Sequence, residues 1–251
     1  MGLRLRQIAL VAAELVPLEH MLAEIFGLAP CYRDLAVAEF GLENVLFPIG
    51  DQFLEIVAPT QAGTAAGRYL DRRGGDGGYM VITQCDDHAP YRQRVAALAV
   101  RIAHEFIAPN FRNMQLHPRD TGGSFFEIDQ QLDDPENWTP AGTAWRECVR
   151  RERVTAIAAA EIQAADPIAV AVRWGAIADL PITSDEGHPL LRLRDAAVRF
   201  VPRADGRPEG LAGLDLMAVD RSAVLRAAAA RGITINNADG FVLGGMRWRL
   251  V

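Results

Sequence analysis

The sequence predicts an α+β protein built from four strand–helix–strands units that form two pairs. One short pattern occurs four times, and in each copy an acid falls seven residues after the start of a strand and precedes a helix. The pattern, in which a strand runs into the acid, covers residues 7–14, 80–87, 159–166 and 213–220. A second strand closes each copy, at residues 52–57, 124–129, 197–201 and 246–251. A single unit of this size cannot bury its apolar face alone, so the units are expected to pair.

Local signals in the first copy define its elements. Residues 3–12 predict a strand and residues 15–26 a helix. Pro17 suits the first turn of that helix, where its missing N–H costs nothing, and Gly27 is a natural stop. Residues 59–78, rich in Gly, Ala and Thr, predict a connector with one short helical turn.

The other copies carry similar signals. The second copy predicts a helix whose apolar stripe runs as far as Ile102, followed by a hairpin at 114–123 that is rich in turn-forming residues. In the third and fourth copies, Asp166 and Asp220 are expected to cap the N-termini of helices.

The best domain boundary is the polar stretch at 130–144, which contains Pro and Gly. We expect a first domain at 1–130, a linker at 131–152 and a second domain at 153–251. The repeats divide these domains into modules at about 1–60, 76–130, 153–203 and 210–251.

Composition excludes several classes of function. Of the 251 residues, 50% are hydrophobic and 23% are charged, which is ordinary for a globular protein. The net charge of −6 argues against nucleic acid or an anionic membrane as partner. The 26 basic residues are all arginine, so lysine Schiff-base chemistry is excluded. Three scattered cysteines fit a reducing compartment.

The N-terminal residues resemble a signal peptide only superficially. Glu14 and Glu19 interrupt the apolar run, and the first repeat needs the same stretch as its opening strand. No apolar stretch approaches the roughly 20 residues needed to span a bilayer. We therefore expect a cytoplasmic protein.

The closing strands differ between the two halves of the chain. Glu55 and Glu127 stand where the second half has Arg199 and Arg249. Strand alternation places each glutamate on one face with apolar neighbours, and Glu127 also shares its face with Asp129. A half-buried carboxyl favours a cation or a substrate proton as companion. The two arginines are expected to pair with acids such as Glu161 or Asp215, or to line a site for an anion.

These features, and the stretch 116–127 (LHPRDTGGSFFE), resemble the vicinal-oxygen-chelate superfamily. That group includes glyoxalase I, methylmalonyl-CoA epimerase, extradiol dioxygenases and bleomycin-resistance proteins. Its shared unit is βαβββ, and two units curl into a cup around the active site. The resemblance implies four βαβββ modules that pair into two cup-shaped domains.

The resemblance also implies a set of metal ligands. The superfamily uses the first residue of each opening strand and the glutamate of each closing strand, which here are Gln7, Glu55, Met80 and Glu127. Met80 departs from the usual histidine, and a thioether is a poor ligand for the divalent ions Zn, Ni, Co, Mn or Mg. Gln7, Glu55 and Glu127 are thus the expected ligands, whereas the second half offers none.

The leading hypothesis is a glyoxalase-like or epimerase-like lyase or isomerase that acts on a small carbonyl or thioester compound. Metal-assisted proton abstraction would occur in the first cup, with Glu55 and Glu127 as ligands and one of them as base. His117 and Arg119 are candidate substrate-binding residues, although each has an ordinary structural explanation. The alternatives are a metal-free binding protein of the bleomycin-resistance type and a purely structural protein. The expected partner is a small-molecule ligand, and the chain is expected to be a monomer with an internal pseudo-dimer or a homodimer.

Overall fold

The computed structural model describes residues 2–237 and 239–251, which form two sheets and five α-helices. The strands of the first sheet are β1 (Arg4–Val11), β2 (Leu42–Ile49), β3 (Gln52–Pro59), β4 (Gly77–Gln84), β5 (Ile102–Ile107), β6 (Phe111–Leu116) and β7 (Phe125–Gln131). The strands of the second sheet are β8 (Val154–Ala164), β9 (Ile182–Asp185), β10 (His188–Arg192), β11 (Ala197–Pro202), β12 (Gly210–Ala218), β13 (Ile235–Asn237), β14 (Gly240–Leu243) and β15 (Met246–Leu250). The helices are α1 (Leu15–Phe26), α2 (Ala65–Arg73), α3 (Ala89–Ala97), α4 (Pro167–Ala178) and α5 (Arg221–Ala230).

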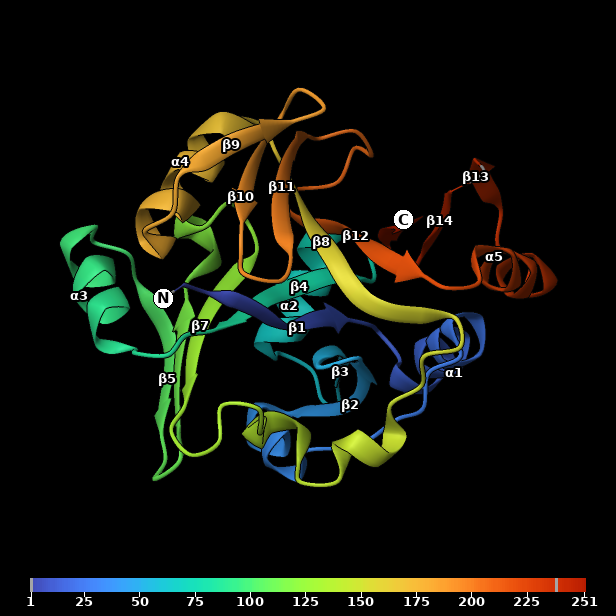
Figure 1. Cartoon of the computed structure of the whole chain (residues 1–251), viewed down its shortest axis with the longest axis horizontal. Coiled ribbons are helices and arrows are strands. Elements are labelled where there is room, and N and C mark those ends of the chain that lie inside the picture. The colour runs from blue at the N-terminus through green and yellow to red at the C-terminus, as the bar shows by residue number, and fades with distance from the viewer. Residues whose placement is uncertain (1, 238) are drawn as a thin grey trace. The chain divides into compact units, whose positions relative to one another are not determined.

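Each sheet contains two consecutive modules (Figure 1). The first has the order β2-β3-β1-β4-β7-β6-β5 and the second the order β13-β14-β15-β12-β8-β11-β10-β9. In both sheets the closing strand of a module pairs in parallel with an opening strand, as β7 pairs with β4 and β11 with β8. The prediction of an α+β fold with four paired modules is confirmed.

Most predicted helix ends are also confirmed. Gly27 ends α1 with a positive φ of 69°, and the side chains of Asp166 and Asp220 accept hydrogen bonds at the starts of α4 and α5. The predicted extent of the second helix is wrong. Helix α3 ends at Ala97 because Ala99 adopts a left-handed φ of 52°, and Ile102 begins β5 instead. The 59–78 connector contains α2, a helix of nine residues.

The chain forms two compact units, each assembled from three separate stretches. Unit 1 comprises Met1–Gln7, Tyr79–Thr139 and Ala159–Leu211. Unit 2 comprises Ile8–Gly78, Pro140–Ala158 and Ala212–Val251. Each unit therefore combines one module of the first sheet with one module of the second.

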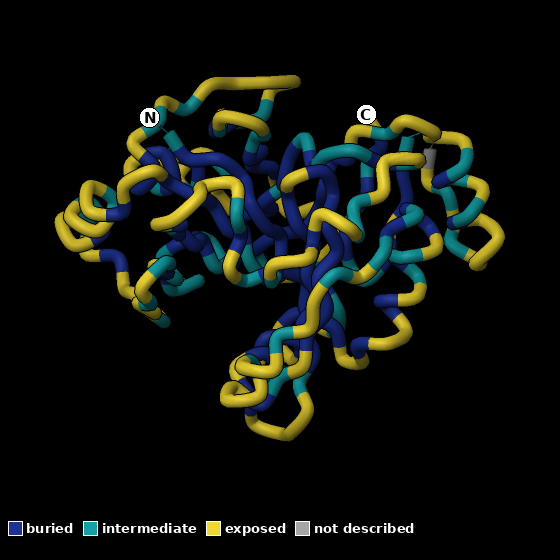
Figure 2. The backbone as a smooth tube through the Cα atoms, turned by 60° about the horizontal axis from the view of Figure 1, so that its bottom comes forward, coloured by how far each residue is buried: buried dark blue, intermediate teal, exposed yellow. Residues whose placement is uncertain are grey.

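Aromatic packing around α4 forms the core of unit 1. The Trp174 ring is fully buried, stacks on Phe126 of β7 at 4.1 Å between ring centroids, and meets Phe200 of β11 edge-on at 5.7 Å. Its Nε1 donates a hydrogen bond of 2.9 Å to the carbonyl oxygen of Thr121, so the indole is buried with its polar atom satisfied. Figure 2 shows long buried stretches of backbone in the interior, whereas exposed residues concentrate in the outer loops of the tube.

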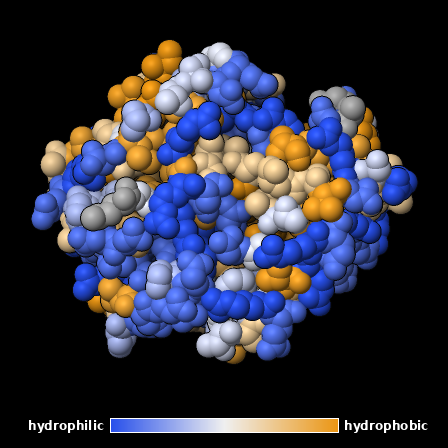
Figure 3. All heavy atoms as spheres, in the orientation of Figure 1, coloured by the Kyte–Doolittle hydropathy of each residue, from blue (hydrophilic) through white to orange (hydrophobic). Residues whose placement is uncertain are grey.

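The core of unit 2 is built around α1. Phe26 packs against Phe241 at 5.9 Å and against Trp248 at 4.8 Å between ring centroids. The indole N–H of Trp248 donates to the carbonyl oxygen of Leu243 at 3.0 Å. On the face seen in Figure 3, hydrophilic atoms surround separate groups of apolar atoms. No helix within the described residues is long and apolar enough to cross a membrane.

Candidate functional site

One face of the first sheet within unit 1 carries polar side chains from adjacent strands. Parallel pairing of β4 with β7 places Ile82 opposite Glu127. Antiparallel pairing places Gln115 of β6 opposite Glu127, and His104 of β5 opposite Gln115. Directly opposite residues share a face of a sheet, so Glu127 and these three neighbours lie on the same side.

Glu127 and Asp129 form a buried carboxyl pair on this face. They are separated by one residue along β7, so both side chains point to the same side. Glu127 is 6% exposed and Asp129 is 0% exposed. Asn113 Nδ2 donates to Asp129 Oδ1 at 3.0 Å, and Gln115 Nε2 donates to Glu127 Oε2 at 2.9 Å. Each carboxyl group is thus held by an amide from β6.

Burial changes the protonation of this pair. It raises the pKa of Asp129 well above the usual value, and the charge of Glu127 adds to the rise. Burial also raises the pKa of Glu127, but the hydrogen bond from Gln115, the contact with Asp129 and the charge of His104 oppose that rise. Two adjacent buried carboxylates cannot both ionise easily, so we assign one shared proton to the pair, held by Asp129.

A proton on Asp129 also satisfies a buried oxygen. Among the described residues, Asp129 Oδ2 has no hydrogen-bond donor, whereas the Glu127 carboxyl group lies beside it. A protonated Oδ2 can donate to Glu127, which then carries the negative charge. In this assignment, the pair is a neutral acid next to a charged base.

The side of the face near Met80 is the more accessible one. Met80, Gln115 and Phe125 are all half-buried. Gln115 Nε2 donates to Met80 Sδ at 3.4 Å as well as to Glu127. Glu127 keeps a small exposed fraction on this side, whereas Asp129 has none.

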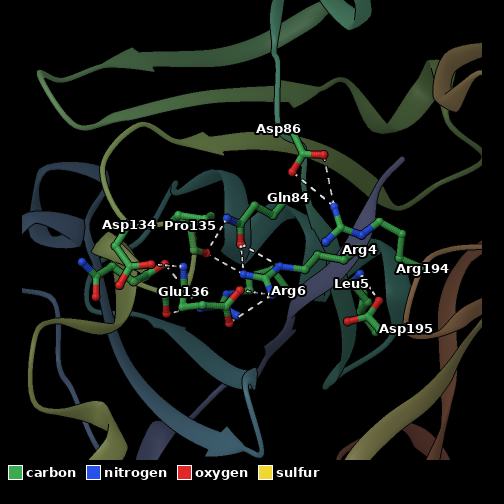
Figure 4. Close-up of polar contacts among 11 residues, drawn as sticks. Arg4, Leu5, Arg6, Gln84, Asp86, Asp134, Pro135, Glu136, Arg194 and Asp195 are labelled. Carbon is green, nitrogen blue, oxygen red and sulfur yellow. Dashed lines mark hydrogen bonds and ion pairs between the residues drawn. The ribbon is translucent and has the colours of Figure 1, made fainter. Parts of the chain in front are cut away.

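Residues 132–139, which follow β7, pack against the opposite end of the face. Arg4 holds this 132–139 segment in place (Figure 4). Its Nη2 donates to the Pro135 carbonyl oxygen at 2.6 Å, and its Nη1 forms an ion pair of 3.1 Å with Glu136. The same guanidinium donates to Gln84 Oε1, and Gln84 pairs with Asp129 in the sheet.

Arg6 and Trp138 complete the attachment of the 132–139 segment. Arg6 Nη2 donates to the Glu136 carbonyl oxygen at 3.0 Å, and the guanidinium lies over the Trp138 ring at 5.3 Å. Trp138 packs edge-on against Phe111 of β6 at 5.4 Å. Its indole N–H donates to Gln7 Oε1 at 2.8 Å. The segment closes the Phe111 end of the face and also engages the side chain of Gln7.

The structure places the four positions implied as metal ligands on adjacent strands of the first sheet. Glu55 lies on β3, Gln7 on β1, Met80 on β4 and Glu127 on β7. Gln7, Met80 and Glu127 belong to unit 1, whereas Glu55 belongs to unit 2. Within the described parts of the chain, no three His, Cys, Asp or Glu side chains are grouped so that they could hold a metal ion.

Glu55 is buried in unit 2, with 8% of its surface exposed. Asn44 of β2 donates to Glu55 Oε1 at 2.7 Å. Phe53, on the same face of β3, meets Trp145 edge-on at 5.0 Å between ring centroids. The aromatic cover beside Glu55 resembles that of Trp138 over Phe111 in unit 1.

His117 and Arg119 lie at a turn after β6. His117 Nδ1 accepts a hydrogen bond of 3.2 Å from the Arg119 backbone N–H, so its ring caps the short 3-10 helix Pro118–Asp120. His117 is half-buried and Arg119 is exposed. These contacts give His117 a structural role in the turn, and substrate binding by either residue stays a prediction.

The two arginines of the second half were expected either to pair with acids or to line a site for an anion, and the structure shows that they pair with acids. Arg199 is opposite Glu161 in the register and forms an ion pair of 3.0 Å with it in unit 1. Arg249 is opposite Asp215 and forms an ion pair of 2.6 Å with it in unit 2.

Sequence reasoning missed three polar residues of the candidate site. Asn113 and Gln115 are separated by one residue, as Glu127 and Asp129 are, so strand alternation places both on one face. The same reasoning applied to residues 111–116 would have found them. His104 is half-buried on β5, a strand that begins at Ile102, where the sequence predicted the end of a helix. Only the register of β5 and β6 brings His104 next to Gln115.

Comparison with protein-family models and with curated proteins gave no match. Solved structures with similar folds do exist. A mutant of 4-hydroxymandelate synthase from Streptomyces coelicolor is 14% identical, with a TM-score of 0.71 over 93% of this chain and 76% of that chain. A hypothetical protein from Staphylococcus aureus is 12% identical, with a TM-score of 0.66 over 100% of this chain and 99% of that chain. Methylmalonyl-CoA epimerase from Mycobacterium tuberculosis is 20% identical, with a TM-score of 0.44 over 52% of this chain and 87% of that chain.

These similarities identify the class of fold. The synthase is a member of the vicinal-oxygen-chelate superfamily. The chain has the vicinal-oxygen-chelate fold, and the resemblance predicted from the sequence is confirmed at that level. The identities of 12% and 14% to the two structures that match nearly the whole chain show a shared fold and carry no activity with them.

Proposed function

We propose that unit 1 moves a proton to and from the carbon next to the carbonyl group of a small ketone, aldehyde or thioester, as an isomerase or epimerase does. The buried Glu127–Asp129 pair is the observation that supports this proposal. It keeps one charged base beside one neutral acid, and the base lies near the half-buried Met80 and Gln115. Carboxyl pairs whose environments separate their pKa values are typical of acid–base catalysis.

The proposed step balances with a single proton. Glu127 takes the proton from carbon, and the electron pair of the C–H bond forms the C=C bond of an enolate whose charge lies on the former carbonyl oxygen. His104, whose charge already acts on Glu127, is the side chain that we assign to this developing oxyanion. Return of the proton from Glu127 to the carbon regenerates the base.

The contacts in unit 1 do not fit the divalent metal that the fold class implies. The Gln7 amide oxygen accepts a hydrogen bond from Trp138, and Met80 offers a thioether that accepts one from Gln115. Glu127 is the one strong ligand that remains of the three implied positions in unit 1, whereas hard divalent ions need several oxygen or nitrogen donors. The proposed reaction therefore uses side chains of the protein alone.

Proton exchange measured by NMR in D2O tests this function. Simple ketones and acyl thioesters with exchangeable C–H groups are the probes, and the wild-type protein is expected to speed deuterium incorporation. Glu127→Gln removes the base and is expected to reduce that rate at least roughly a hundredfold. Equal rates in both proteins would refute the proposal. Binding of a probe without any exchange would instead favour the metal-free binding protein.

A further inference from the structure

Gln115 holds a position from which it can select the substrate of the proposed reaction. It projects from β6 directly opposite Glu127 and is half-buried, so it lies beside the base on the accessible side of the face. Its amide nitrogen donates to two acceptors, Glu127 Oε2 at 2.9 Å and Met80 Sδ at 3.4 Å. A primary amide nitrogen carries two hydrogens, so these two bonds use both of them.

The thioether of Met80 determines the orientation of the Gln115 side-chain amide. A thioether sulfur has no hydrogen and can only accept, so the amide group that faces it must be the N–H2 group. This argument holds whether Glu127 is charged or protonated. The carbonyl oxygen of Gln115 consequently points away from both partners, and the described residues supply no hydrogen bond to it.

We infer that Gln115 is a specificity-determining residue and that the substrate is an α-hydroxycarbonyl compound. A ligand that presents its acidic C–H to Glu127 meets a hydrogen-bond acceptor, Gln115 Oε1, beside the reacting carbon. A hydroxyl group on the carbon next to the carbonyl can donate to that oxygen, whereas an alkyl group leaves it unsatisfied. This inference rests on the proposed proton transfer at Glu127. Met80, at the position where a histidine was expected, then acts as a positioning residue.

Hydroxyacetone and butanone form a matched pair of probes, because a hydroxyl in the first replaces a methyl in the second. Each catalysed exchange rate is divided by the uncatalysed rate of the same probe, and saturation-transfer NMR measures binding separately. The wild-type protein is expected to prefer hydroxyacetone about fivefold to tenfold in both measurements, as one neutral hydrogen bond allows. Met80→Leu and Gln115→Leu are expected to reduce this preference to about twofold or less.

Met217→Leu is the control, because Met217 is an exposed methionine of unit 2 and the change in chemistry is identical. It should keep the full preference for hydroxyacetone. Exchange and binding without any preference would overturn the inference and leave the proposed function in place. A binding preference without exchange would overturn the proposed function, and with it the assignment of a substrate, while still showing that Gln115 selects a ligand with a hydroxyl group. Neither binding nor exchange would overturn both.

Discussion

Replacing Asp129 with asparagine is expected to stabilise the protein increasingly as the pH rises. The folded state raises the pKa of Asp129 well above its usual value, because the side chain is fully buried next to Glu127. An unfolded chain releases this proton near pH 4, whereas the folded protein keeps it. The wild-type protein must therefore lose stability as the pH rises from about 4 to the raised pKa.

The number of protons sets the magnitude. A single retained proton makes the free energy of unfolding fall by at most about 1.4 kcal/mol per pH unit, which is roughly 3–6 °C in Tm for a chain of this length. Asparagine cannot ionise, but its amide oxygen can still accept from Asn113 and its nitrogen can donate to Glu127. The variant keeps the contacts and lacks the titration, so its Tm should exceed that of the wild type by a margin that grows with pH.

Thermal unfolding followed by circular dichroism between about pH 5 and pH 8 measures this margin. Asp71→Asn is the matched control, because Asp71 is exposed on α2 and the chemical change is the same. The Tm of this control should change with pH in the same way as the Tm of the wild type. If the Tm of Asp129→Asn also changes with pH as that of the wild type does, the shared proton does not exist. The proposed base, Glu127, then has no neutral acid beside it.

Three further predictions concern the metal, the 132–139 segment and the second sheet. Protein purified without chelator should contain far less than one Zn, Ni, Co, Mn or Mg ion per chain by plasma mass spectrometry. Added ions should also leave the Tm unchanged. Finding one ion per chain in the wild type and none in Glu127→Gln would contradict this prediction. Trp138→Phe removes the indole donor to Gln7 and should lower the free energy of unfolding by about 1–3 kcal/mol. Amide hydrogen exchange in residues 132–139 should become faster. Protection equal to that of the wild type would show that the hydrogen bond does not hold the 132–139 segment. Arg199→Met removes the buried cation that pairs with the half-buried Glu161 and should cost about 3–5 kcal/mol by urea unfolding. Restored stability after the added change Glu161→Leu would confirm that the pair is structural.

Repetition made the fold predictable. Four copies of the pattern, with the acid at the same position in each, predicted four modules. The acids and glycines at helix ends were also predictable because they contact residues that are near in sequence, as Asp166 does at the start of α4. Pairing of Arg199 with Glu161 was also accessible, since both stand at equivalent points of parallel strands in one module. These features depend on residues that are close in sequence or related by the repeat.

The candidate site was less predictable because its contacts join unrelated parts of the chain. The hydrogen bond from Trp138 to Gln7 spans 131 residues, and nothing in the polar stretch around Trp138 indicates that it folds back over β6. The end of α3 depends on one alanine in a left-handed conformation, which propensity does not favour. Glu127 and Asp129 were visible as a pair, but their shared proton depends on complete burial, which needs the three-dimensional structure.

The interleaving of the two compact units has a consequence for how the chain is made. Residues 8–78 leave the ribosome well before residues 212–251, yet unit 2 is complete only when both stretches are present. The apolar surface of α1 that Phe26 presents to Trp248 therefore has no partner until residues 212–251 have been synthesised. Such late, long-range closure slows folding and leaves nascent chains open to aggregation. For the same reason, cleavage anywhere between residues 139 and 159 splits both units at once, so neither half of this chain inherits a complete core.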